Sequence, residues 1–209
     1  MRQLLALARE LPDRNRGPRR GATYHAIFAV LYALGLRVGE VSRLELGDLD
    51  LDRQLLWIRN SKFGKSRLVP FGPRLGALLV TYVEESSDGR LRSPEAPLFT
   101  FDGRHGVSTN SIRNAFRDHL LPRLQPTLPP GIRPPRVHDL RHSFAVGTLL
   151  RWYRSGVDPA ARLPHLSTFL GHINPTATAV YLTITAELLQ EAKRRFSTFA
   201  LGLTTEVAP

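Results

Sequence analysis

The chain of 209 residues contains no cysteine. This absence excludes a disulfide framework, a thiol nucleophile and a metal site built from thiolates. Long apolar runs are missing as well, because no stretch approaches the roughly 18 apolar residues that a membrane-spanning helix needs. The N-terminal segment carries acidic residues and lacks the small-residue cleavage site of a signal peptide. We therefore expect a cytoplasmic protein with no membrane partner.

Lysine is scarce, since Lys62, Lys65 and Lys193 are the only lysines among 29 basic residues. The abundance of arginine suits phosphate recognition by its planar fork, although a GC-rich genome also favours arginine codons. Codon usage does not explain the net charge of +11 or the isoelectric point near 11.1. The excess is spread over both halves of the chain, which indicates a polyanionic partner, double-stranded DNA before a membrane surface.

The apolar fraction of 42% is ordinary for a folded domain. Apolar periodicity and capping signals predict helices over residues 3–11, 23–34, 38–44, 73–85, 108–121, 139–154, 159–169, 175–182 and 186–199. Strands are expected over 55–59 and 67–71, joined as a hairpin with Lys62 at its tip, and over 98–101. The fold class is therefore α+β, mostly helical with a small antiparallel sheet. We expect one domain over 1–209, with 1–20 as an N-terminal extension and 186–209 as a C-terminal helix and tail.

Several side chains that could take part in a reaction lie at or near the ends of these elements. Arg37 comes just after a helix end, and Lys62 lies in the hairpin turn. Alone, each has a structural explanation, as a salt-bridged arginine and a solvated lysine. Tyr181 alone is typical of a core aromatic residue.

A second group opens the helix predicted at 139–154, where His138, Arg141 and His142 follow one another at helical spacing. They are also consistent with an ordinary helix N-terminus. His138 and His142 could ligate a metal, but no acid or thiol is placed to complete the site. Neither a metal nor a cofactor is expected.

A further histidine, His172, ends the stretch Leu170-Gly171-His172 and precedes Tyr181 by nine residues. Taken together, two arginines, one lysine, two histidines and a tyrosine match the needs of metal-free phosphoryl transfer to tyrosine: Arg37, Arg141, Lys62, His138, His172 and Tyr181. Two guanidinium groups can hold both non-bridging oxygens of a phosphodiester. A lysine can protonate the leaving alkoxide. A phenol has a pKa of about 10 and needs a base or a strongly cationic pocket, which histidine and arginine provide.

The sequence resembles the tyrosine recombinase, or phage integrase, family. The matching stretches are LYALGLRVGEVSRLELGDLDL, SKFGKSRLVPF, HDLRHSFAVGTLL and FLGHINPTATAVY, in the family's order. The resemblance covers about residues 24–190 and implies the family's catalytic domain. It implies a site-specific DNA recombinase or integrase that cleaves and rejoins strands through a 3′-phosphotyrosine.

The resemblance also implies roles for individual residues. Arg37, His138, Arg141 and His172 match the arginine and histidine positions of the family, and Glu40 matches the nearby acid that supports the site. Lys62 matches the general acid, with Lys65 as its competitor at the same turn. Tyr181 matches the nucleophile.

The family's pattern is incomplete at the N-terminus, where a separate DNA-binding domain usually precedes the catalytic domain. Residues 1–20 alone precede the pattern here, so we expect a short member, a truncated gene or a fragment. The resemblance implies a homo-oligomer, a tetramer on DNA, assembled through the C-terminal helix at 186–199, which could equally pack on its own domain. A catalytically inactive DNA-binding remnant or regulator is the alternative function. A type IB topoisomerase fits the Leu-Gly-His to Tyr181 spacing less well.

Overall fold

The computed structural model describes residues 1–13, 18–59, 64–87, 92–125, 131, 133–172 and 178. The chain divides into two compact units. The first unit holds residues 1–144 and 169–171, and the second holds 145–168 and the residues from 172 onward. Two helices contribute to both units, α7 (Asp139–Arg154) and α8 (Pro159–Leu170).

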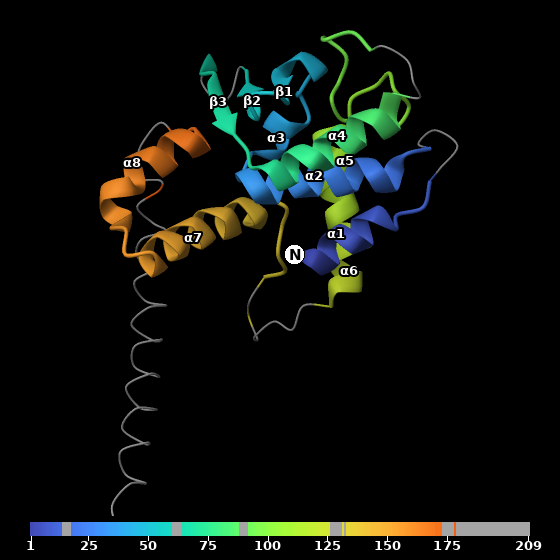
Figure 1. Ribbon diagram of the computed structural model, residues 1–209. Coiled ribbons are helices and arrows are strands. Elements are labelled where there is room, and N and C mark those ends of the chain that lie inside the picture. The colour runs from blue at the N-terminus through green and yellow to red at the C-terminus, as the bar shows by residue number, and fades with distance from the viewer. Residues whose placement is uncertain are drawn as a thin grey trace, which may run out of the picture. The chain divides into compact units, whose positions relative to one another are not determined.

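The core of the first unit forms around α2 (Arg20–Leu34), which packs against α1 (Arg2–Arg9) and α4 (Pro73–Ser87) (Figure 1). Most residues of helix α2 are buried, as expected for a helix largely enclosed by other elements, whereas Tyr32 and Ala33 near its C-terminal end are exposed. It therefore gives the site that follows its C-terminal end a rigid support.

Helix α2 ends where the sequence predicts, at Gly35. This glycine has a φ of 59°, the left-handed conformation that terminates many helices. A Cβ atom at this position would lie 2.6 Å from Cδ1 of Phe144, so the close packing also requires glycine. The tight end of α2 brings the chain directly into the short helix α3 (Val38–Val41).

The sheet consists of three antiparallel strands in the order β1 (Leu49–Asp50), β2 (Leu55–Ile58) and β3 (Arg67–Pro70). The predicted pairing of the two hairpin strands is confirmed, and β3, which ends at Pro70, is an edge strand. The strand predicted over residues 98–101 is wrong. That stretch forms an isolated bridge between Thr100 and Gly106, and the third strand of the sheet is β1.

The two faces of the sheet differ as the alternation of a strand requires. Leu56, Ile58 and Val69 are buried, whereas Trp57 and its cross-strand neighbour Leu68 are exposed. Residues two apart on a strand share a face, so the side chain at position 67 lies on the same face as Val69 and points inward.

The helix predicted over 108–121 is present in three pieces: α5 (Thr109–Asn114), a π-helical segment η3 (Ala115–Leu120) and α6 (Leu121–Leu124). Ser108 is its N-cap, because the Ser108 hydroxyl accepts a hydrogen bond from the backbone N–H of Ser111.

Helix α3 ends at Val41, three residues before the end of the predicted helix 38–44, because the chain turns at residues 42–43. Helix α7 spans 139–154 as predicted, and α8 extends one residue beyond the predicted 159–169. The helices expected over 175–182 and 186–199 lie outside the described residues. A mostly helical chain with a small antiparallel sheet confirms the α+β class.

Candidate active site

Arg37 and Glu40 are brought together by the start of α3. Arg37 is the N-cap residue, and its extended backbone (ψ 146°) turns the chain into the helix. The backbone N–H of Arg37 donates to Oε2 of Glu40 over 2.9 Å, the contact that a glutamate at the third helical position makes in a capping box. Local helix geometry therefore forms this pair, although only the family resemblance indicated a role for Glu40.

Glu40 is buried, with 4% of its surface exposed, and it binds two arginines. Nη1 of Arg37 donates to Oε1 over 2.9 Å. Arg67, on β3, approaches as a fork, with Nη1 at 2.9 Å from Oε1 and Nη2 at 3.0 Å from Oε2. Each carboxylate oxygen thus accepts two hydrogen bonds, so the cost of burying the carboxylate is offset by charged partners.

The C-terminal end of α8 supplies acceptors for three arginines. Nε of Arg67 donates to the carbonyl of Phe169 over 2.8 Å, and Nη2 of Arg37 donates to that of Gly171 over 2.9 Å. Nη2 of Arg141 donates to the carbonyl of Leu170, which lies between them, over 2.8 Å. The last carbonyls of a helix have no partner within the helix and carry partial negative charge, which favours guanidinium donors.

Arg141 is more deeply buried than Arg37. It is 2% exposed, and its Nη1 donates to the carbonyl of Gly35 over 2.7 Å. The side chain of Arg37 keeps 25% of its surface exposed. The first unit therefore brings Arg37, Glu40 and Arg141 together, with Arg37 as the arginine that reaches the surface.

A cleft of about 760 Å³ opens beside Arg37. Among the described residues that line it, Glu40 is the single acid; the basic side chains are Arg37, Arg43, Arg113, Arg117, Arg136 and His138. We call it the arginine cleft. Its composition suits an anionic ligand with several phosphates.

His138 lies at the edge of the arginine cleft, just before α7. Partial removal from solvent lowers its pKa below the usual value for histidine, and the neighbouring His142 and Arg141 lower it further. The His138 and His142 rings are in edge contact, with centroids 4.8 Å apart. Among the described residues, no group of three or more His, Asp and Glu side chains is placed to hold a metal ion.

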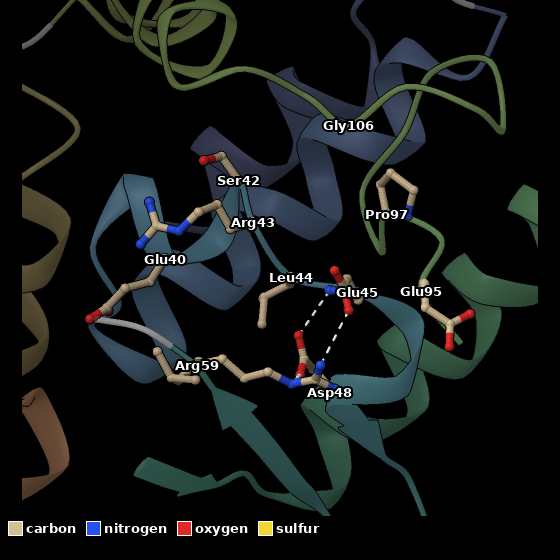
Figure 2. A pocket seen from close by; sticks show the side chains of 11 residues that line it. Glu40, Ser42, Arg43, Leu44, Glu45, Asp48, Arg59, Glu95, Pro97 and Gly106 are labelled. Carbon is tan, nitrogen blue, oxygen red and sulfur yellow. Dashed lines mark hydrogen bonds and ion pairs between the residues drawn. The ribbon is translucent and has the colours of Figure 1, made fainter. Parts of the chain in front are cut away.

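A second cavity, of about 420 Å³, has the opposite character. Glu40, Glu45, Asp48 and Glu95 outnumber its two arginines. Figure 2 shows Arg59, which directly follows β2, extending to Glu45 and Asp48, with Nε 2.5 Å from Oδ1 of Asp48. This ion pair fixes the end of β2 against the segment that precedes β1. A polyanion would be repelled by the acids here, so this cavity is structural.

The other predicted residues are placed as follows. His172 belongs to the second unit, where its Nδ1 lies 2.6 Å from Oγ1 of Thr178. Lys65 is exposed, whereas Lys62 and Tyr181 lie outside the described residues.

Arg67 was missed by the sequence reasoning. The sequence does contain an indication of its role. Arg67 shares a strand face with the apolar Val69 and Phe71, and an arginine on a buried face needs an acidic partner.

Comparison with known proteins places the chain in a family, because the phage integrase family model matches residues 2–187. The chain belongs to the phage integrase family. It is 39% identical over 203 residues to a Sinorhizobium fredii (strain NBRC 101917 / NGR234) protein named as an integrase/recombinase, y4rB, covering 93% of this chain. It is 34% identical over 169 residues to the tyrosine recombinase XerA of Thermococcus kodakarensis (strain ATCC BAA-918 / JCM 12380 / KOD1), covering 81% of the chain.

This phage integrase chain spans 62% of the Sinorhizobium protein and 54% of the archaeal one. Its fold is similar to the crystal structure of XerA recombinase, with a TM-score of 0.67 and 24% identity over 93% of this chain and 62% of that one. It is also similar to XerH recombinase bound to its difH substrate, with a TM-score of 0.62, 17% identity and coverage of 87% and 47%. None of the helices that the structure describes is long and apolar enough to span a membrane.

Proposed function

We propose that this chain is the catalytic part of a site-specific DNA recombinase that cleaves and rejoins strands through a 3′-phosphotyrosine. The observation that carries the proposal is the convergence of Arg37 and Arg141 on adjacent carbonyls beside a cleft lined by further arginines. A phosphodiester needs this concentration of fixed positive charge, because negative charge builds on its oxygens in the transition state.

The roles of the residues follow from their chemistry. Arg37, which lines the cleft, contacts the non-bridging oxygens of the phosphodiester. The buried Arg141 contributes positive charge that stabilises the negative charge on these oxygens. Glu40 orients Arg37. A neutral His138 can exchange a hydrogen bond with a phosphate oxygen, and His172 is proposed to do the same.

The covalent step is assigned to residues outside the described part of the chain. The Tyr181 hydroxyl gives its proton to a histidine of the site and its oxygen attacks phosphorus. The bond from phosphorus to the 5′ oxygen breaks, and the 5′ oxygen leaves with a proton from Lys62. The new ester keeps the energy of the broken bond, so the 5′ hydroxyl of a partner strand can attack it and release Tyr181. Lys65 is the alternative proton donor.

Recombination requires several copies of the chain on DNA, and we propose a tetramer joined through residues 186–199. Supporting this, the first unit has an apolar cleft of about 540 Å³ whose lining includes Leu34, Phe71, Leu75, Phe144 and Phe169. The Leu188→Asp and Leu189→Asp changes should then reduce the mass of the DNA complex in sedimentation velocity. An unchanged mass would show that this helix packs within its own copy.

The test of the function is a covalent trap. A pool of nicked duplexes with randomised cores and bridging phosphorothiolates is incubated with the chain, and adducts are resolved on denaturing gels. We expect an adduct that survives denaturation and disappears in Tyr181→Phe. Selection of trapped duplexes then defines the preferred site.

Two outcomes would point to the alternatives. DNA binding with no adduct at any sequence would identify a non-catalytic remnant or regulator. Adducts without sequence preference, with relaxation of supercoiled plasmid by a monomer, would identify a topoisomerase.

A further inference from the structure

We infer that Arg67 is a positioning residue for Arg37 and acts through the carboxylate of Glu40; the inference rests on the proposed strand cleavage. Arg67 spans both oxygens of Glu40 with its two terminal nitrogens. Arg37 shares this carboxylate, with its Nη1 donating to Oε1. Its Nη2 is directed to the carbonyl of Gly171.

The two arginines compete for the carboxylate of Glu40, so the presence of Arg67 determines how Arg37 is oriented. A carboxylate prefers a two-pronged pair with a guanidinium when the geometry allows one. If Arg67 were absent, Arg37 could rotate to take both oxygens of Glu40. It would then give up the bond to Gly171 and turn away from the arginine cleft.

Arg67 is itself held independently of Arg37. It emerges from β3 opposite Ile58, and its Nε donates to the carbonyl of Phe169. Its guanidinium also packs on Gly171, where a Cβ would lie 2.7 Å from Nη1. These contacts tie β3, α3 and the end of α8 into one support.

Arg67 does not belong to the substrate surface. Its side chain is only 11% exposed, and it is absent from the lining of the arginine cleft, to which Arg37 and Glu40 both contribute. It therefore acts on the reaction through Glu40 and not by touching DNA.

The test compares Arg67→Met, Arg67→Lys and Glu40→Gln in the whole chain, using the trapped duplex for single-turnover adduct formation. Arg67→Met should lower the rate about 10- to 100-fold, since small displacements of a catalytic group have effects of this size. DNA affinity should stay within about twofold, because Arg67 makes no substrate contact. Arg67→Lys keeps the charge but cannot span both oxygens and the Phe169 carbonyl, so it should not restore the rate.

The matched control is Arg53→Met, because Arg53 lies in the turn between β1 and β2 and its side chain is 80% exposed. It should leave the rate unchanged. The effects of Arg67→Met and Glu40→Gln on the rate of adduct formation should be non-additive. The double variant should be only slightly slower than the slower of the two single variants. Additive effects, or a lower melting temperature with an unchanged rate, would overturn the inference.

A second measurement does not depend on catalysis. In a crystal structure of Arg67→Met, or of Arg67→Lys if the first is unstable, we expect Arg37 to take both oxygens of Glu40 and to leave the Gly171 carbonyl. An Arg37 side chain that stays in place would contradict the inference. Failure of the wild-type chain to form any adduct would instead reject the proposed function and leave this structural test intact.

Discussion

Arg37 and Arg141 donate hydrogen bonds from Nη2 to the carbonyls of adjacent residues, Gly171 at 2.9 Å and Leu170 at 2.8 Å. Two side chains far apart in the sequence are thus oriented by one short stretch of backbone at the end of α8. The same stretch leads directly into His172. A change in the conformation of residues 170–171 would therefore disturb both guanidinium groups at once.

The two arginines should differ in their effect on stability. Arg37→Ala and Arg141→Ala are each expected to lower the cleavage rate about 10²–10³-fold. Arg141→Ala also removes the donors to the buried Gly35 and Leu170 carbonyls, which should lower the free energy of unfolding by about 2 kcal/mol or more. Urea unfolding measures the difference. Equal stability of the two variants would show that these carbonyls find other partners.

Gly35 offers a test of the close packing at the end of α2. Gly35→Ala should destabilise the chain by about 2–4 kcal/mol, because it adds left-handed strain to a clash with Phe144. Gly103→Ala is the matched control, since its φ of 79° imposes similar strain but nothing lies within 4 Å. Thermal unfolding should show a smaller loss for Gly103→Ala. Equal losses would mean that the Phe144 ring moves aside freely.

The pKa of His138 predicts a pH dependence. Because this pKa is lowered in the folded chain, the unfolded chain takes up a proton first as the pH falls through about 6.5. The folded state should therefore lose stability on acidification in that range, and less so in His138→Gln. An NMR titration of the His138 ring should give a midpoint below that of an unperturbed histidine. A midpoint above it would show that Asp139 outweighs burial and the nearby cations.

The arginine cleft predicts salt-sensitive DNA binding. Affinity should fall linearly with the logarithm of salt concentration, since each neutralised phosphate releases counterions. Changing Arg113 and Arg117, which line the cleft, to Gln should reduce the slope by about 1 for each residue that contacts a phosphate. Arg53→Gln is the control outside the cleft. Fluorescence anisotropy at several salt concentrations checks this, and a flat dependence would contradict the assignment of the cleft to DNA.

Local patterns predicted much of the fold. The C-terminal end of α2, both ends of α7 and the hairpin pairing depend on contacts between residues close in sequence. The pairing of Arg37 with Glu40 is also local, because three residues separate them at a helix start, but only the family resemblance indicated a role for Glu40. Such contacts are set by backbone geometry that every helix and hairpin shares.

The sequence-based predictions were wrong or incomplete where a residue's partner lies far away in the sequence. The third strand was expected at residues 98–101, but the two-residue β1 pairs with β2 instead. A strand of that length carries no periodic signal, and its neighbours decide its conformation. Arg67 was overlooked for the same reason, since nothing near it in sequence indicates Glu40 or the carbonyl of Phe169 as a partner.

Residue types and their order determined the chemistry that this chain can perform, its basic character and its family resemblance, because these properties belong to the side chains themselves. Only the folded chain decided that Arg67 shares a buried carboxylate with Arg37, and that Arg141 lies beneath the surface while Arg37 reaches the cleft. Burial and hydrogen-bond direction depend on which distant segments pack together. They arise from the packing of α2, β3 and the end of α8, and no local pattern contains them.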